Sequence, residues 1–501
     1  MKRKNDSMNK HMDSQQSDAN KGKDNRGASH ARSIKDDRRA PHTGGAKDDR
    51  RSSQAGGIKD DRRASHTGRT KEDSSSRLAE NPKETLQSLC RYTGKCGGCA
   101  NTGIPYEKQL EAKQHRIEAL FREFNCPVER IIGSDSPFHY RNKVHSVFSR
   151  DKNGKVIRGM YAQESHKVIN VSGCLLEDKT ADAIINEVKR LASVYKMKIY
   201  DEDTQTGFLR HVLVRAAQYH GTGSYMVVIV TAEVQFEGKN NFVKLLKNKF
   251  PEISTIIQNI NNKRTSMVLG ERNITIYGKG YVVDDSLGFE FRISPSAFFQ
   301  INSAQTRKLY ETALKMAAPK PDDTVLDAYC GTGTIGMFLS RASGHVTGVE
   351  LNPDAVRDAV DNAKRNMIDN IEFVCADATE YMSDKANFPK VPDILCMDPP
   401  RSGSTPEFIN AAADLGISRI VYVSCDPETL VRDIKLFRKR GYGIERVVPV
   451  DMFPMTEHCE TVCLLKKIAD LQKRLDSQYD IMDDVEHAMA EVKISRIGSK
   501  Q

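Results

Sequence analysis

The stretch TVLDAYCGTGTIGMFLS, residues 324–340, decides the fold class of the C-terminal half of the chain. It consists of an apolar strand, a glycine-rich turn and the start of a helix. Four further apolar runs follow along the chain, namely GHVTGVELN, IEFVCADA, DILCMDPP and RIVYVSCDP, and an amphipathic helix is predicted at residues 353–366. Strands that alternate with helices predict an α/β domain built on a parallel sheet, with its ligands at the carboxyl ends of the strands.

The glycine-rich turn predicts a site for a ligand that approaches the backbone closely. Gly331, Gly333 and Gly336 reproduce the spacing G-x-G-x-x-G, and Glu350 follows about 20 residues later, where a carboxylate can accept hydrogen bonds from two ribose hydroxyls. This pattern alone fits either a nicotinamide dinucleotide or S-adenosylmethionine.

A second motif narrows the choice toward methyl transfer. Asp398-Pro399-Pro400 at a strand end is similar to the (Asn/Asp)-Pro-Pro-aromatic loop of methyltransferases that modify amino groups. Arg401 stands where those enzymes have an aromatic residue. The departure argues against an exocyclic nitrogen as the acceptor and leaves room for a carbon acceptor.

Cys425 lies at the exit of an apolar run, in VYVSCDPETL at residues 421–430. A structural cysteine is expected inside such a run, whereas α/β enzymes place reactive groups where a strand ends. The position therefore suggests a nucleophile, with a buried structural thiol as the alternative.

The first 80 residues differ from the rest of the chain. They contain few large apolar side chains, and Lys-Asp-Asp-Arg-Arg recurs at a 12-residue period from Lys35, Lys47 and Lys59. With 20 Lys and Arg against 13 Asp and Glu, this segment carries most of the formal net charge of +9. We predict a disordered basic tail, either an RNA-binding arm or a solvated extension.

No apolar run approaches the roughly 18 residues of a membrane span, so we expect a cytoplasmic protein without a membrane partner. Because the cytosol keeps thiols reduced, the 11 cysteines require an explanation other than disulfides. Cys330, Cys375, Cys396 and Cys463 lie in or next to predicted strands, and we expect them in the core.

A dense group of cysteines predicts a metal centre. Cys90, Cys96 and Cys99 have the spacing C-x5-C-x2-C, and Cys174, in a Ser-Gly turn after a short β-branched strand, is the best fourth ligand. The local trio with one distant cysteine favours a [4Fe–4S] cluster, while zinc or no metal remains open.

Taken together, the motifs resemble those of the RNA uracil-C5 methyltransferases of the RumA/TrmA type. The resemblance covers roughly residues 88–467 and rests on eight matches in order: CGGC with YEKQL following, YRNKV, GFLRHVLVR, SPSAFFQIN, LDAYCGTGTIG, MDPPRSG, YVSCDPETLVRD and VDMFPMTEHCE. It implies a C-terminal Rossmann-like class I methyltransferase domain, S-adenosylmethionine as the methyl donor and an RNA substrate. Members with the cysteine trio carry a [4Fe–4S] cluster.

The resemblance also implies a role for individual residues. Cys425 is the nucleophile that adds to C6 of uracil, because C5 is too weak a nucleophile until a thiolate activates the ring. Glu460 is the base that removes the C5 proton afterwards. The residues that match the family's contacts with S-adenosylmethionine are Gln300, Tyr329, Thr334, Glu350 and Asp398.

The cluster-bearing branch of the family favours a uridine of 23S ribosomal RNA as the target, with the T-loop uridine of tRNA as the alternative. The small RNA-binding barrel that many relatives carry, called TRAM, is replaced here by the polar repeat, which weakens this guide to the target. Two other functions fit the sequence less well. A non-catalytic RNA-binding protein would not need both Cys425 and Glu460. A small-molecule methyltransferase would need neither the basic tail nor the cluster.

The predicted organisation is a monomer with four parts. They are a disordered tail (1–83), a central α+β domain that binds RNA and the cluster (84–290), the methyltransferase domain (291–467) and a C-terminal helical extension (468–501).

Overall fold

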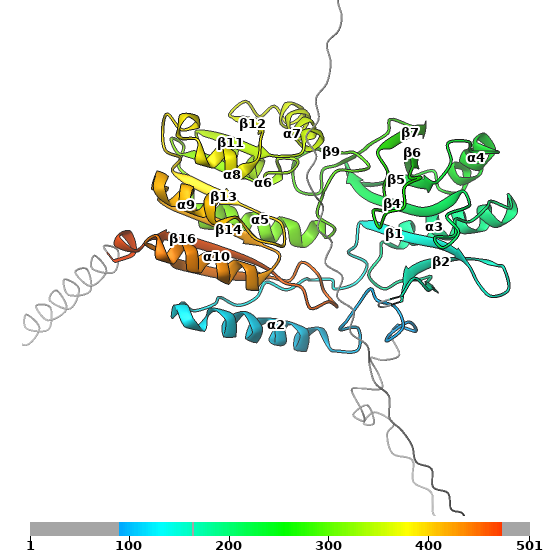
Figure 1. Cartoon of the computed structure of the whole chain (residues 1–501), viewed down its shortest axis with the longest axis horizontal. Helices are drawn as coiled ribbons and strands as arrows, with labels where there is room; N and C mark the ends of the chain where they lie inside the picture. The colour runs from blue at the N-terminus through cyan, green and yellow to red at the C-terminus, as the bar shows by residue number, and fades with distance from the viewer. Residues whose placement is uncertain (1–89, 163–164, 473–501) are drawn as a thin grey trace, which may run out of the picture. The chain divides into compact units, whose positions relative to one another are not determined.

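The computed structural model describes residues 90–162 and 165–472 of the 501-residue chain. These residues belong to one compact unit. The predicted tail and most of the predicted C-terminal extension lie outside the described residues, although residues 468–472 are helical. The two large sheets of the described part are shown in Figure 1.

The first sheet has seven strands in the order β3-β2-β1-β4-β5-β6-β7. All neighbours are antiparallel except β5 and β6. Helices α3 (Lys179–Val194) and α4 (Lys239–Lys249) pack on one face of the sheet through a shared apolar core. The strands are β1 Lys143–Arg150, β2 Val156–Tyr161, β3 Val168–Asn170, β4 Leu209–Tyr219, β5 Thr222–Thr231, β6 Ile253–Ile260 and β7 Arg272–Tyr277.

The second sheet has the order β12-β11-β10-β13-β14-β16-β15 and is parallel except for β16, which runs antiparallel to both of its neighbours. The prediction of a Rossmann-like α/β domain is therefore confirmed, and each apolar run of the C-terminal half forms a strand. The strands are β10 Thr324–Ala328, β11 His345–Glu350, β12 Ile371–Cys375, β13 Ile394–Met397, β14 Arg419–Ser424, β15 Tyr442–Val450 and β16 Glu460–Lys467.

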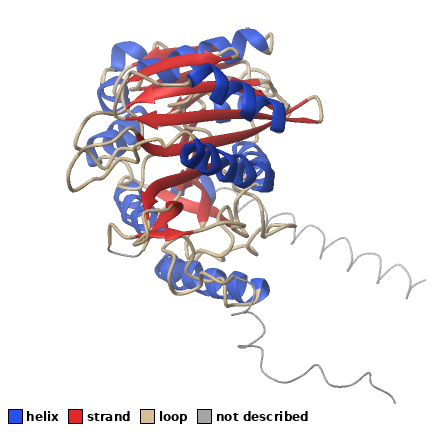
Figure 2. Ribbon diagram, turned by 90° about the vertical axis from the view of Figure 1, so that its right-hand side faces the viewer, coloured by secondary structure: helices blue, strands red, loops and turns tan. Residues whose placement is uncertain are grey.

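Helices cover both faces of the second sheet, whereas Figure 2 brings the first sheet to the front, with helices over its near side. One face of the second sheet packs against α5 (Ser303–Ala317) and α6 (Thr334–Ser340), with α7 (Pro353–Arg365) beside β11 and β12. The other face packs against α2, α8, α9 and α10. The bounds of these four are α2 Tyr106–Phe121, α8 Ala378–Ser383, α9 Pro406–Leu415 and α10 Pro427–Lys439.

Local sequence explains where α7 begins and ends. The Asn352 side chain caps the first turn by accepting a hydrogen bond from the Asp354 backbone N–H, and Pro353 occupies the first helical position. Lys364 and Arg365 lie in the last turn, where their positive charges interact favourably with the negative end of the helix dipole. The predicted helix at residues 353–366 is confirmed.

One hydrophobic core joins the two sheets. It contains Leu213 and Met226 of the first sheet together with Val421 of the second sheet and Leu309 and Phe338 of the helices that cover it. The two-stranded ribbon of β8 (Val282–Asp284) and β9 (Phe291–Ile293) contributes to the same core.

One predicted core cysteine is not in the core. Cys375 is exposed, because it ends β12, which is the edge strand of the second sheet. An apolar run in the sequence does not reveal whether its strand lies at an edge. Within the described residues, no helix is both long and apolar enough to cross a membrane.

Candidate active site

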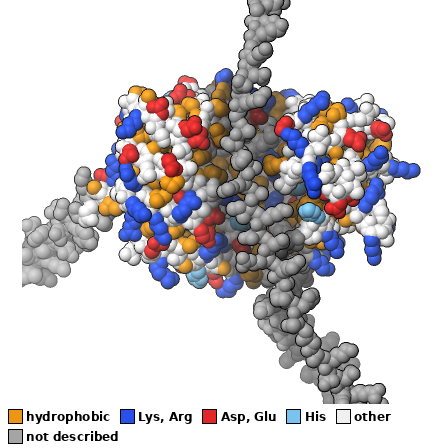
Figure 3. All heavy atoms as spheres, viewed as in Figure 1, with side chains coloured by type: hydrophobic (Ala, Val, Ile, Leu, Met, Phe, Trp, Pro, Cys, Tyr) orange, Lys and Arg blue, Asp and Glu red, His pale blue; other side chains and the backbone are white. Residues whose placement is uncertain are grey.

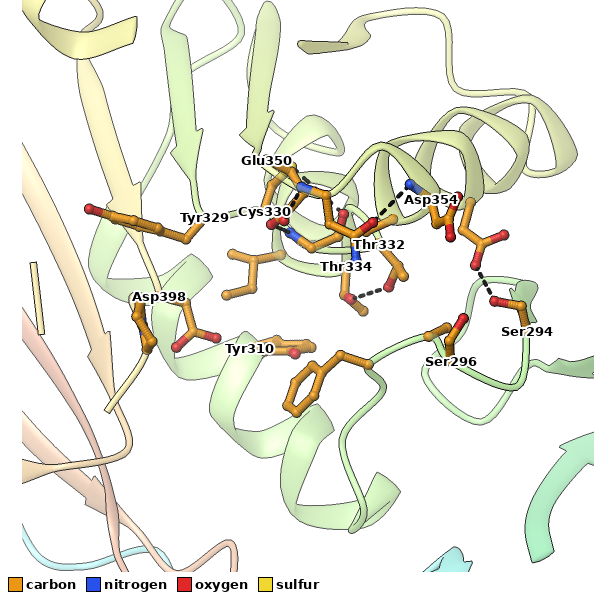
Figure 4. Close-up of a pocket in the computed structure, with 18 residues that line it drawn as sticks. Ser294, Ser296, Tyr310, Tyr329, Cys330, Thr332, Thr334, Glu350, Asp354 and Asp398 are labelled. Atoms are coloured by element: carbon orange, nitrogen blue, oxygen red, sulfur yellow. Dashed lines mark hydrogen bonds between the residues drawn. The ribbon is translucent and has the colours of Figure 1, made fainter. Parts of the chain in front are cut away.

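A cavity of about 340 Å³ lies at the carboxyl edge of the second sheet, where the strand pattern predicts a ligand. It is lined by the turn after β10, the ends of β11 and β13, the start of α7 and the segment 294–298. In Figure 4, Tyr329 and Asp398 lie at one end of the cavity, and Ser294 and Ser296 lie at the other.

Four of the five predicted donor-binding residues line this cavity: Tyr329, Thr334, Glu350 and Asp398. The fifth, Gln300, is buried and is not among the lining residues. Its side chain lowers the pKa of the Tyr310 hydroxyl, and Tyr310 does line the cavity. Gln300 therefore acts on the cavity through Tyr310.

The turn after β10 requires glycine. Gly333 has a φ of +79°, and a Cβ atom there would lie 2.6 Å from the ring of Phe373. The Glu350 carboxylate holds the turn, since one of its oxygens accepts from the Gly331 N–H at 3.0 Å and the other from the Asn352 N–H at 2.8 Å. Each oxygen keeps a second acceptor position for a ligand hydroxyl.

The sequence did not single out several residues of the cavity. Tyr310 comes from the buried face of α5, and the Ser294 hydroxyl donates to an Asp358 carboxylate oxygen at 2.8 Å. Asp327, which does not line the cavity, lies fully buried in β10, and burial raises its pKa to about 8. Only Asp327 leaves a signal in the sequence, as a carboxylate inside an apolar strand.

Cys425 sits in the tight connection between β14 and α10. The Asp426 side chain caps α10 by accepting from the Thr429 N–H at 3.0 Å, and Pro427 takes the first helical position. The Ser424 hydroxyl donates to the Asp426 carbonyl at 2.9 Å. These contacts fix the half-buried Cys425 thiol just beyond the edge of the sheet.

The pairing of β14 with β16 brings Glu460 beside Cys425. The antiparallel register pairs Ser424 with Thr461, so the next step along the same ladder places Cys425 next to Glu460. Glu460 is itself paired with Val450 of β15 and is only 3% exposed. Two residues that lie 35 positions apart in the chain thus meet at one sheet edge.

Asp398, at the end of β13, lines the cavity, and its charge also acts on Cys425 and Glu460. Burial raises its pKa to about 7, and burial together with the charge of Asp398 raises the pKa of Glu460 well above its usual range. Burial and the same two carboxyls raise the pKa of Cys425 to about 11, while Arg401 opposes the increase. The thiol and both carboxyls form one electrostatic cluster with Arg401 beside it.

The four cysteines predicted to hold a metal centre also come together. Cys90, Cys96, Cys99 and Cys174 line one small cavity, with Arg141 among the other lining residues. Burial raises the pKa of Cys99 to about 12 and that of Cys174 to about 11, and Arg141 lowers both values.

The geometry of the quartet does not fit a single ion. In the part of the chain that the structure describes, no group of three or more His, Cys, Asp or Glu side chains is arranged to hold a metal ion. The cavity nevertheless favours negative charge, because the Arg141 guanidinium lines it and lowers the pKa of Cys99 and Cys174.

The other three predicted core cysteines, Cys330, Cys396 and Cys463, are buried as expected. Cys126, for which the sequence predicts no role, is half-buried. Cys459, next to Glu460, is also buried, and its thiol donates to the Val450 carbonyl at 3.6 Å.

Comparisons with known proteins identify the family. Residues 105–468 match the family model described as tRNA (uracil-5-)-methyltransferase. An uncharacterized RNA methyltransferase of Clostridium tetani is 38% identical over 391 residues, which is 77% of this chain and 84% of that protein. Another, of Staphylococcus aureus strain MRSA252, is 40% identical over 380 residues, covering 75% of this chain and 83% of that protein.

A solved structure agrees with these matches. The crystal structure of Pyrococcus abyssi tRNA (uracil-54, C5)-methyltransferase in complex with S-adenosyl-L-homocysteine superposes with a TM-score of 0.62 and 27% identity, and the match covers 74% of this chain and 86% of that chain. The chain therefore belongs to the tRNA (uracil-5-)-methyltransferase family and is an RNA methyltransferase.

Proposed function

We propose that the protein transfers a methyl group from S-adenosylmethionine to C5 of a uridine in RNA, through a covalent bond between Cys425 and C6 of the base. One observation carries the proposal: the β14–β16 register sets Cys425 beside Glu460, next to the cavity that Asp398 lines. A nucleophile, a base and a donor cavity at one sheet edge are what C5 methylation requires.

The cavity suits S-adenosylmethionine. The Glu350 carboxylate has free acceptor positions for ribose hydroxyls, and Tyr329, Thr334 and Asp398 surround the remaining space, with Gln300 acting through Tyr310. When bound, the donor supplies an electrophilic methyl group on a sulfonium centre.

The residues of the chain account for each step on the uracil ring. The Cys425 thiolate adds to C6, and the electrons of the C5–C6 double bond move toward the C4 carbonyl, which makes C5 nucleophilic. After C5 has gained the methyl group, the Glu460 carboxylate takes the C5 proton. The double bond then re-forms, and the C6–S bond breaks to release the thiolate.

Arg401 favours the reactive form of the nucleophile. Its charge opposes the rise in the pKa of Cys425 and of Glu460 that burial causes. Addition needs a thiolate and elimination needs a free carboxylate, so a cation at the position of the usual aromatic residue supports both steps.

The RNA target we propose is a uridine of 23S ribosomal RNA, because the resemblance associates the cysteine quartet with that branch. The T-loop uridine of tRNA is the second candidate, favoured by the Pyrococcus abyssi relative, whose target is uracil-54 of tRNA. Figure 3 shows Lys and Arg side chains over the part that carries the first sheet, interspersed with acidic side chains. This surface and the basic N-terminal tail would contact the phosphates of the RNA.

A direct assay separates the two targets. The full-length protein is incubated with unmodified 23S ribosomal RNA or tRNA and with S-adenosylmethionine that carries a labelled methyl group. We expect 5-methyluridine in a single oligonucleotide of the ribosomal RNA after nuclease digestion. Label in tRNA alone would contradict the ribosomal target and would leave the chemistry unchanged.

For the cysteine quartet we propose a [4Fe–4S] cluster. Each cysteine of such a cluster binds a different iron, so four thiolates around a cluster stand further apart than four around one zinc ion. The four thiols line one cavity, and the Arg141 charge offsets the negative charge of the thiolates.

Metal analysis tests this proposal. Protein purified without oxygen should be brown and should contain iron and inorganic sulfide in near-equal amounts. Cys99→Ser should lose most of both, whereas Cys126→Ser should keep them, since Cys126 lies outside the quartet. Stoichiometric zinc without sulfide would contradict the cluster.

A further inference from the structure

The segment that precedes Glu460 is held in place by parts of the chain that lie far away in the sequence. Residues 451–459, here called the base loop, connect β15 to β16 and end directly before Glu460. Within this loop Met455 has a φ of +66°. A side-chain-bearing residue adopts this left-handed conformation only where its surroundings hold it there.

Gln109 of α2 supplies that support. Its side-chain oxygen accepts from the Met455 backbone N–H at 3.0 Å, and its side-chain nitrogen lies 3.1 Å from the Met455 sulfur. Gln109 is only 1% exposed, which is unusual for a glutamine in an amphipathic helix.

The same glutamine binds the segment of residues 90–104, here called the cysteine segment, which contains Cys90, Cys96 and Cys99. Its side-chain nitrogen also donates to the carbonyls of Asn101 at 3.1 Å and Ile104 at 2.7 Å, and the Asn101 backbone N–H donates to the Met455 carbonyl at 3.1 Å. The chain just after Cys99 and the chain just before Glu460 therefore meet at one side chain.

Further contacts with other elements hold the rest of the base loop. Lys113 forms a buried ion pair with Asp451 at 2.6 Å, and the Tyr106 hydroxyl donates to the same carboxylate at 2.8 Å. The Tyr140 hydroxyl donates to the Pro454 carbonyl at 3.0 Å. Asp451 and Pro454 are thus fixed independently of Gln109, whereas the Gln109 side chain binds only Met455 in the loop.

We propose that Gln109 is a positioning residue for Glu460: it fixes the turn at Met455 and so sets where the base stands relative to the C5 proton. This inference rests on the proposed role of Glu460. It also gives the cysteine segment a role in the reaction, because Asn101 and Gln109 act on the same turn. Methyl transfer itself depends on Cys425 and the donor cavity, which Gln109 does not contact.

The variant Gln109→Ala tests the proposal. The loss of both contacts with Met455 should displace the carboxylate and slow elimination between about 10- and 100-fold. In a rapid-quench experiment with labelled methyl donor, methyl transfer in the first turnover should stay within about twofold of wild type, because Cys425 and the donor cavity keep their geometry. A covalent, methylated protein–RNA species should then accumulate on denaturing gels.

A matched control lies on the same helix. Gln114 binds the Glu118 side chain and the backbone of residues 129 and 131 and makes no contact with the base loop. Gln114→Ala should therefore show the adduct level of wild type. The ratio of adduct to released product counts only active molecules, so partial misfolding of a variant does not alter it.

The outcomes distinguish this inference from the proposed function. If Glu460→Gln accumulates the methylated adduct and Gln109→Ala does not, the base is correct and the positioning role is wrong. Equal slowing of methyl transfer and of product release in Gln109→Ala would also overturn the positioning role. If Glu460→Gln itself turns over without adduct, the assignment of the base fails, and the positioning role fails with it.

Discussion

Cys425→Ala should lose more than about 10⁴-fold in methyl transfer, because it removes the group that activates C5 of the uracil. The variant should still bind RNA and S-adenosylmethionine, since the thiol is not among the residues that line the donor cavity. RNA with 5-fluorouridine at the target position gives a direct test. It should trap wild-type enzyme as a covalent adduct, because fluorine cannot leave as a cation, and it should not trap Cys425→Ala.

A second cysteine provides the control. Cys459 lies next to Glu460 but is buried, and its thiol faces the Val450 carbonyl. Cys459→Ala should therefore keep the adduct. An adduct in Cys425→Ala would show that another cysteine is the nucleophile, with Cys459 the first to examine.

The pH dependence of trapping provides a further check on the nucleophile. Burial and the two carboxyls raise the pKa of Cys425 to about 11, so the thiol is largely protonated at neutral pH. As long as the pH stays below this pKa, each increase of one pH unit raises the thiolate fraction about tenfold. The rate of trapping should therefore rise from about pH 6 to about pH 9. A rate that falls with increasing pH would not fit a thiolate nucleophile at this site.

The sequence predicted the methyltransferase domain well because the signal for that domain is local. Alternating apolar runs and helical spacing are recognised from neighbouring residues. The glycine-rich turn at Gly331 and Gly333 likewise indicates a ligand site. The same reasoning failed at Cys375, since an edge strand has the same apolar pattern as a central one.

The arrangement of the active site could not be derived from local patterns. The proximity of Cys425 and Glu460 depends on an antiparallel β16 inserted between β14 and β15, which is a long-range pairing without a local signal. Glu460 was identified only through its motif match. Gln109 left no signal at all, because its role depends on how α2 packs against a loop almost 350 residues away.

Glu460→Gln should stop the reaction after the methyl group has been transferred. Glutamine has nearly the size of glutamate but cannot take the C5 proton, so addition of Cys425 and methylation of C5 proceed while elimination does not. Turnover should fall between about 10²- and 10⁴-fold, the range expected for the loss of a general base. The variant should accumulate a covalent protein–RNA species that carries the labelled methyl group and survives denaturing gels.

The same substitution three residues earlier is the control for this result. Glu457 is exposed and belongs to the base loop, so Glu457→Gln changes the charge of the loop without removing the buried carboxylate. It should turn over as wild type does and leave no adduct. Normal turnover of Glu460→Gln would place the base elsewhere. Asp398 would then be the carboxylate to test, because it is half-buried near Glu460 and burial raises its pKa to about 7.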